Sequence, residues 1–288
     1  MSDYGVITLA TKHDYVKAVG MLLSIKQSTP DVLVTLVSSP EIGDAVGHYF
    51  DSFVPENKEL KGFEHKLHLD SYSPYEKTFF FDADILVFGN LDDVQAQWAG
   101  RPYIANGRYL NSGLSSFGLD RQYVMSKLNK DKLVNIGGAG HAYFERPACE
   151  ALFELARKIG SNYEDYANKC RFADEDVVAI AMTILDLPPA ELENFVARVF
   201  HARKGTMAMD VSRSECSFIS AKNGALVQPF LVHFATREGG LLYYRNLRKL
   251  FNRHGIDLHK ELAVTFINDF RTLLNWRSKS MLKKILKS

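Results

Sequence analysis

Cysteine is scarce in this chain, and its copies form no metal-binding or disulfide pattern. Cys149, Cys170 and Cys216 are odd in number and far apart, and no CxxC pair occurs. Structural zinc sites and disulfide frameworks need paired cysteines, so the composition argues against both. A reducing compartment fits these free thiols, and we expect a cytoplasmic protein.

Net charge and long apolar runs are also missing. The 35 basic and 34 acidic side chains leave a formal charge of +1. General nucleic-acid binders need a strong positive field, so we expect no nucleic-acid partner. No apolar stretch approaches the length of a membrane span. The first residues carry neither a basic region nor an apolar core, and we expect no secretory signal there.

What the sequence does contain is apolar material in short blocks. Hydrophobic residues make up 46% of the 288 positions, which is enough for a large core. Residues 5–10 (GVITLA) and 32–37 (VLVTLV) predict buried strands. Between them, Val16, Val19, Leu22 and Leu23 keep helical spacing. This β-α-β start is typical of an α/β protein with a mainly parallel sheet covered by helices.

Further elements follow along the chain. We predict an edge strand at 53–54, a short helix at 63–69, and strands at 78–81, 85–88, 103–105 and 142–144. Pro147 should open a helix that runs to about residue 159, and another should begin at 174. Late strands are expected at 195–200 and 230–234, with helix from 258 onward. We expect one large domain over residues 1–250 and a helical extension over residues 251–288.

Two carboxylates interrupt the most apolar part of the chain. Asp82-Ala83-Asp84 separates residues 79–81 (FFF) from residues 85–88 (ILVF). Burying two unpaired charges within a strand would cost several kcal/mol, so both should lie at a strand end and meet a counter-charge. In an extended chain the two side chains would point to the same side. Together they can hold a hard divalent cation, although a solvated turn with two acids is the simpler alternative.

The run Tyr75-Glu76-Lys77 followed by residues 78–87 resembles the DxD region of GT-A glycosyltransferases. It is most similar to glycosyltransferase family 8 and the glycogenin-like group. Three other segments match in the same order along residues 5 to 235. They are the first strand end Thr8-Leu9-Ala10-Thr11 with Tyr15, the lysine Lys66, and the late strand that ends in His233.

The resemblance implies a GT-A type, Rossmann-like domain that binds a UDP-sugar through a metal ion. The cofactor would be Mn²⁺ or Mg²⁺, held by Asp82, Asp84 and His233. The donor would also contact Ala83 and Lys66, while residues 8–11 would meet the uracil and Tyr15 would stack on it. On their own, His233 and Tyr15 could equally be core residues, and Lys66 could be an ordinary surface lysine.

The sugar side departs from the family pattern. The family carries Asn-x-Gly near the Gly137–Gly140 stretch, and the asparagine is missing here; Gly138 remains a candidate for close approach to the sugar, and Asn111-Ser112-Gly113 is a second candidate motif. Glu175 replaces a family glutamine. In the family this motif reaches the donor sugar and the reacting centre, so the resemblance makes Asp174 and Asp176 the candidate catalytic residues, which would hydrogen-bond the sugar hydroxyls. Acidic residues also suit a helix N-terminus. After His233, Arg237 could take the place of a phosphate-binding lysine.

The last residues, 276–288 (WRSKSMLKKILKS), are basic and amphipathic. Such a segment can lie on an anionic membrane surface, or it can be a solvated terminal helix. Peripheral membrane contact through this segment is one expectation, because acceptors of such enzymes are often lipid-linked.

The sequence thus predicts a metal-dependent glycosyltransferase that moves a hexosyl group from a UDP-sugar to a hydroxyl of a glycan or lipid-linked acceptor. The family resemblance implies retention of configuration. Two alternatives stay open: a phosphatase of the haloacid dehalogenase type, which also uses Asp-x-Asp, and a non-catalytic nucleotide-sugar or glycan-binding relative.

Overall fold

The computed structural model describes residues 3–137, 140–167, 170–235 and 240–285. The chain forms two compact units, and each is made of segments that are distant in sequence. The first comprises residues 1–9, 31–81 and 92–195, and the second comprises residues 10–30, 82–91 and 196–288. The domain boundary predicted at residue 250 falls inside a helix of the second unit, α9 (Gly240–His254).

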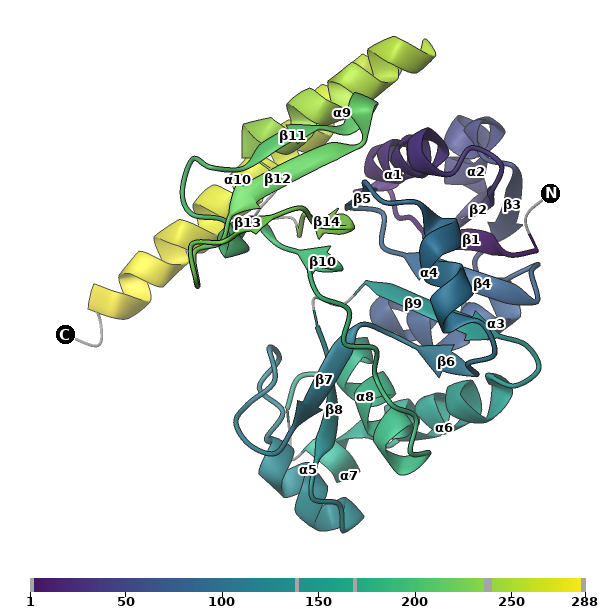
Figure 1. The fold of residues 1–288 in the computed structure, drawn as a ribbon, viewed down its shortest axis with the longest axis vertical. Helices are drawn as coiled ribbons and strands as arrows, with labels where there is room; N and C mark the ends of the chain where they lie inside the picture. The colour runs from purple at the N-terminus through teal and green to yellow at the C-terminus, as the bar shows by residue number, and fades with distance from the viewer. Residues whose placement is uncertain (1–2, 138–139, 168–169, 236–239, 286–288) are drawn as a thin grey trace. The chain divides into compact units, whose positions relative to one another are not determined.

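The first unit is built on a six-stranded sheet with the order β3-β2-β1-β4-β9-β6 (Figure 1). Strands β3, β2, β1 and β4 pair with one another in parallel, whereas β9 is antiparallel to both of its neighbours, β4 and β6. A mixed sheet with a parallel core was predicted, and this is confirmed. The strands are β1 (Gly5–Leu9), β2 (Leu33–Ser38), β3 (Ser52–Pro55), β4 (Lys77–Phe81), β6 (Tyr103–Ile104) and β9 (His141–Glu145).

Burial explains this order. Strands β1 and β4 are central, and nearly all their side chains are buried, as expected where both faces of a sheet are covered. Strand β3 is half-exposed and lies at the edge, as its short, mixed sequence predicted. A separate hairpin pairs β7 (Gly107–Leu110) with β8 (Leu133–Ile136).

The helices of the first unit close its core. The apolar faces of α6 (Glu150–Ser161) and α8 (Asp174–Ile184) pack on side chains of the sheet, including Ile7, Phe80 and Phe144. The remaining helices are α2 (Pro40–Val46), α3 (Leu69–Tyr72), α4 (Leu91–Trp98), α5 (Arg121–Leu128), α7 (Tyr163–Ala167) and the 3₁₀ turns η1 (Gly47–Tyr49) and η2 (Gly62–His68).

The short helix predicted over residues 63–69 is present as a 3₁₀ helix over residues 62–68. Its first turn is closed by Glu64, whose carboxylate accepts the Lys61 backbone N–H at 2.8 Å. The predicted start of the helix at Pro147 was wrong. Pro147 lies in the turn before α6, which starts at Glu150. The backbone N–H of Cys149 donates to the Glu145 carbonyl at 2.8 Å, so this turn links β9 to the helix.

The second unit joins short strands to three long helices. Strand β14 (Leu231–His233) pairs with both β10 (Val196–Ala197) and β5 (Ile85–Val87), and β11 (Ala208–Asp210), β12 (Glu215–Ile219) and β13 (Leu226–Val227) form a second sheet. The 3₁₀ turns are η3 (Val199–His201) and η4 (Val211–Arg213). The helices are α1 (Tyr15–Ser28), α9 and α10 (His259–Ile285).

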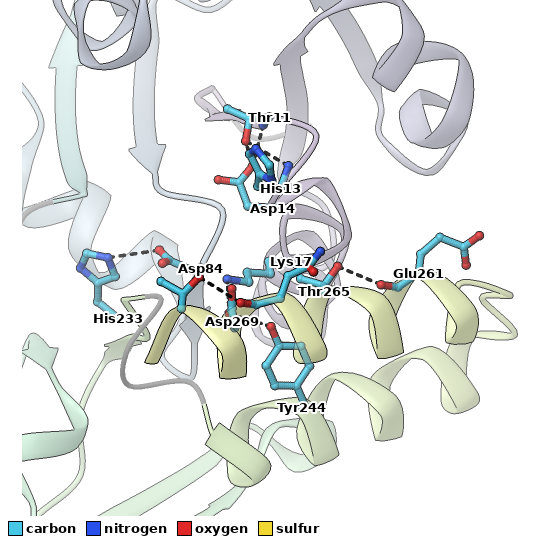
Figure 2. A network of polar contacts seen from close by, with 12 residues as sticks. Thr11, His13, Asp14, Lys17, Asp84, His233, Tyr244, Glu261, Thr265 and Asp269 are labelled. Atoms are coloured by element: carbon cyan, nitrogen blue, oxygen red, sulfur yellow. Dashed lines mark hydrogen bonds and ion pairs between the residues drawn. The ribbon is translucent and has the colours of Figure 1, made fainter. Parts of the chain in front are cut away.

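A buried ion pair joins these three helices. Lys17 on α1 lies 2.6 Å from the carboxylate of Asp269 on α10, and the side chains are 3% and 15% exposed. The hydroxyl of Tyr244 on α9 donates to the same carboxylate at 2.7 Å (Figure 2). The C-terminal helix is therefore fastened to the first helix by matched charges. Within the part of the chain that the structure describes, no helix is long and apolar enough to cross a membrane.

We expect Lys17→Met to destabilise the protein by about 3–5 kcal/mol, because it leaves the Asp269 carboxylate half-buried without its cation. Urea denaturation followed by circular dichroism measures the change. Lys12→Met, at an exposed position, is the matched control and should change stability by less than about 0.5 kcal/mol. Equal stability of the two variants would show that the pair contributes nothing.

Candidate metal and donor-sugar sites

The acidic triplet lies in a tight turn. Asp82 directly follows β4, and the backbone N–H of Ile85 donates to the Asp82 carbonyl at 3.1 Å, which closes a four-residue turn before β5. The prediction of an extended segment, with both carboxylates on one side, was wrong in its geometry. The turn instead brings Asp82 and Asp84 together at the end of a strand, while Ala83 between them is 3% exposed.

Strand pairing brings in the third side chain. β14 runs antiparallel to β5 with His233 opposite Ile85, one residue after Asp84. The N–H of Phe234 donates to the Asp84 carbonyl at 2.9 Å and fixes this register. On the other side of the pair, the N–H of Phe88 donates to the Phe230 carbonyl at 2.8 Å. The pairing of β14 with β5 thus places His233 near Asp82 and Asp84, which lie about 150 positions earlier in the sequence.

The three side chains fit a divalent cation. His233 Nε2 lies 3.1 Å from Asp84 Oδ1 and 3.9 Å from Asp82 Oδ2, and one ligand atom from each residue lies within 4.8 Å of the others. Their side chains are only 10% to 19% exposed. Two carboxylates and one imidazole suit Mn²⁺ or Mg²⁺, with Mn²⁺ favoured by the nitrogen ligand. Figure 2 shows His233 and Asp84 pointing toward each other.

A further acid, Asp14, lies near this group and was not predicted from the sequence. The Asp14 carboxylate accepts hydrogen bonds from the N–H of Thr11 at 2.6 Å and from its hydroxyl at 2.9 Å. Burial raises the pKa of Asp14, the bonds from Thr11 oppose that rise, and the nearby Asp84 charge adds to it. An aspartate just before a helix normally caps it, but this side chain makes no cap bond and turns back to Thr11. Nothing in the local sequence signals this.

A buried hydroxyl completes the surroundings of the acids. Tyr243 is fully buried, its ring stacks on Phe234 with centroids 4.5 Å apart, and its hydroxyl finds no hydrogen-bond partner among the described residues. Burial, followed by the charge of Asp84, holds the pKa of Tyr243 well above its usual value. The acid group therefore lies in a polar but poorly hydrated environment, where a cation would be strongly stabilised.

The first unit contains a second candidate site, around Lys66. Its ammonium lies 3.4 Å from Asp174 Oδ2 and 5.5 Å from the centre of the Phe80 ring, and both charged side chains are mostly buried. They line a small cavity together with Tyr103, His141 and Glu175. His141 Nε2 accepts the N–H of Asn106 at 2.9 Å, which fixes its tautomer and ring orientation.

Asp176, the other predicted acid of α8, has different surroundings. It is 4% exposed, and its carboxylate accepts bonds from the hydroxyls of Ser115 at 2.8 Å and Tyr163 at 3.3 Å. Burial raises its pKa, and these two bonds with the charge of Arg121 oppose the rise. These contacts favour a role in holding α8 in place, and its contact with a sugar stays a prediction.

The other predicted donor residues are distributed between the two units. Thr8 and Leu9 end β1 in the first unit, whereas Ala10, Thr11 and Tyr15 belong to the second. Tyr15 is half-buried, and its pKa is raised by burial and by the charge of Glu261 on α10. Its stacking on a base stays a prediction. Gly138 and Arg237 lie outside the described residues.

Comparison with known proteins gives a likeness of structure only. No family model and no curated protein matches the sequence. The galactosyltransferase LgtC, solved with donor and acceptor sugar analogues, superposes with a TM-score of 0.54 at 13% identity, covering 86% of this chain and 95% of LgtC. The bifunctional glycosyltransferase WbbM gives 0.55 at 11% identity, over 87% of this chain and 51% of WbbM. The glycosyltransferase GlyE of Streptococcus pneumoniae TIGR4 gives 0.51 at 11%, over 97% and 64%.

At such identities the likeness shows the fold alone. The chain has the α/β fold of the GT-A glycosyltransferases, as its sequence predicted. Placement in family 8 stays an expectation from the quoted motifs.

We expect His233→Ala to weaken Mn²⁺ binding by at least roughly tenfold, because two carboxylates alone hold the ion with an incomplete ligand set. Calorimetric titration of the protein with MnCl₂ measures this affinity. His254→Ala removes an exposed histidine of the same unit and serves as the control. Unchanged Mn²⁺ affinity in His233→Ala would show that the imidazole is not a ligand.

Proposed function

We propose that this protein is a metal-dependent glycosyltransferase that transfers a hexosyl group from a UDP-sugar to a hydroxyl of a glycan or lipid-linked acceptor. The observation that carries the proposal is the group Asp82, Asp84 and His233 on a GT-A fold. These residues form an acidic, mostly buried group at the turn after β4, and one ligand atom of each lies within 4.8 Å of the others. A bound cation gives this arrangement a physical reason.

The roles of the residues follow from their charges. When bound, the metal ion would neutralise negative charge on a departing diphosphate. Asp82 and Asp84 would hold that ion, and His233 would complete the set with a neutral nitrogen. Thr11 and Asp14 fix the backbone before α1 through two hydrogen bonds, which would keep the uracil-binding segment rigid.

Lys66 and Asp174 are assigned to the donor sugar. An ammonium that is already 3.4 Å from a carboxylate is held in one rotamer, so it can meet a further anionic or hydroxyl oxygen at little entropic cost. The aromatic walls of Phe80 and Tyr103 exclude water from this pair. We see no side chain here that must act as a covalent nucleophile, and we propose retention on the family resemblance alone.

Two alternatives make different predictions. A phosphatase of the haloacid dehalogenase type would use Asp82 as a nucleophile and would release inorganic phosphate. The three named structures are glycosyltransferases, which supports glycosyl transfer instead. A non-catalytic relative would bind UDP with Mn²⁺ but would not cleave the donor. The missing asparagine near Gly138 is the observation that favours this second alternative.

The test is a panel of nucleotide-sugars, each scored for Mn²⁺-dependent binding and for slow release of UDP. We expect one UDP-hexose to be cleaved, and Asp84→Ala to lower the rate by more than roughly a hundredfold, because a ligand to the charge-neutralising ion is lost. Asp257→Ala, an exposed acid in the same unit, should keep the rate. Absence of UDP binding in the presence of Mn²⁺ would refute the proposal. Release of inorganic phosphate from the nucleotide-sugar by the wild-type protein would favour the phosphatase.

Lys66→Met should lower kcat/KM for the donor by about tenfold to a hundredfold, the loss expected for one charge-assisted hydrogen bond. Lys66→Arg should recover part of the rate, and Lys58→Met at an exposed position is the control. Steady-state kinetics over a range of donor concentrations separates the effects on KM and kcat. An unchanged kcat/KM in Lys66→Met would show that Lys66 does not contact the donor.

A further inference from the structure

A groove between α9 and α10 is lined by none of the residues assigned above to the metal ion or the donor. It has a volume of about 540 Å³, which is within the range of small-ligand sites. It belongs wholly to the second unit. Its described lining residues are Leu241, Tyr244, Arg245, Arg248, Asn252, His259, Leu262, Ala263 and Phe266.

The helix α9 gives this groove a positive wall. Its sequence (GLLYYRNLRKLFNRH) carries four cations and no acid. Lys249 lies 3.2 Å from Asp210, and Arg253 donates to the Ser212 carbonyl, so both are engaged away from the groove. Arg245 and Arg248 are exposed and line it, and among the described residues neither guanidinium has a carboxylate partner.

The acids of α10 point elsewhere. Asp269 is neutralised by Lys17 at 2.6 Å and also binds the Tyr244 hydroxyl. Glu261 lies near α1, where its charge contributes to the raised pKa of Tyr15. No described lining residue of the groove is acidic, while Asn252 and His259 add further hydrogen-bonding groups.

The opposite wall is apolar and continues beyond the groove. Leu262, Ala263 and Phe266 recur at helical spacing on α10 and line the groove together with the arginines of α9. The Phe266 ring stacks near Phe270, with centroids 6.2 Å apart. Phe270 and Leu274, one and two turns further on, are 49% and 45% exposed. The apolar face therefore extends from the groove along α10 into solvent.

We propose that this groove binds the phosphate head group of an anionic membrane lipid. Paired guanidinium groups hold phosphate oxygens through parallel hydrogen bonds, and the adjoining apolar wall suits the start of an acyl chain. A free phosphate would use only the positive half of the site. The site needs neither a metal ion nor a nucleotide-sugar, so it does not depend on the proposed transferase activity.

Flotation with vesicles tests the positive wall. The full-length protein is mixed with phosphatidylcholine vesicles, with or without phosphatidic acid. We expect binding only to the anionic vesicles, weakened at least roughly tenfold in Arg245→Gln/Arg248→Gln, because two charge-assisted contacts are lost. Lys204→Gln/Lys222→Gln removes the same charge from exposed positions of the same unit and should bind like the wild type. The basic segment 276–288 is present in all three proteins. Equal loss in both double variants, or no loss in the arginine variant, would overturn the proposal.

A second measurement tests the apolar wall and separates lipid from free phosphate. Calorimetry compares short-chain phosphatidic acid below its micelle concentration with glycerol 3-phosphate and inorganic phosphate. We expect the lipid to bind roughly tenfold more tightly than either, since it alone contacts Phe266 and its neighbours. Equal affinity for all three compounds would identify a simple anion site and refute the lipid assignment.

Discussion

The structure of the candidate metal site depends on the cost of holding carboxylates together away from water. Asp82, Asp84 and Asp14 are close enough for their charges to interact, in surroundings that include the fully buried Tyr243. Like charges in such a place repel; the charge of Lys17 offsets part of this repulsion at Asp14, and backbone contacts fix the positions of the acids. The turn at residues 82–85, the β5–β14 ladder and the two bonds from Thr11 are those contacts. They hold the acids in an arrangement that a divalent cation would stabilise.

Two mostly buried acids of α8 in the first unit also need partners that stabilise their charges, and each has different ones. Asp174 and Asp176 are two residues apart on α8, yet one faces the ammonium of Lys66 and the other is held by Ser115 and Tyr163 in the core. Helical geometry turns positions i and i+2 to different sides, so two neighbouring acids cannot serve one ligand equally. Lys66 balances the charge of Asp174, and the charge of Arg121 stabilises the carboxylate of Asp176.

The central strands and the position of the acidic pair could be predicted from the sequence. Apolar blocks predicted the strands β1, β2, β4 and β5, and an acidic pair between two such blocks pointed to the site. His233 could be proposed only through family resemblance, because its role depends on a register between strands that are distant in sequence. The Lys17–Asp269 pair could not be predicted, because it joins two helices that are distant in sequence. The position of Asp14 beside Asp84 could not be predicted either, because it depends on a distant turn of the chain. The acidic triplet was predicted to be extended because strands flank it on both sides and the break between them is only three residues long.

The interleaving of the two units has a consequence for how the protein is made. The second unit is assembled from residues 10–30, 82–91 and 196–288, so a ribosome completes the first unit's last segment before the second unit has its remaining strands. Asp82 and Asp84 cannot meet His233, and Lys17 cannot meet Asp269, until those later residues have been synthesised. The side chains of these acids and of this lysine therefore stay solvated while the intervening segments are made.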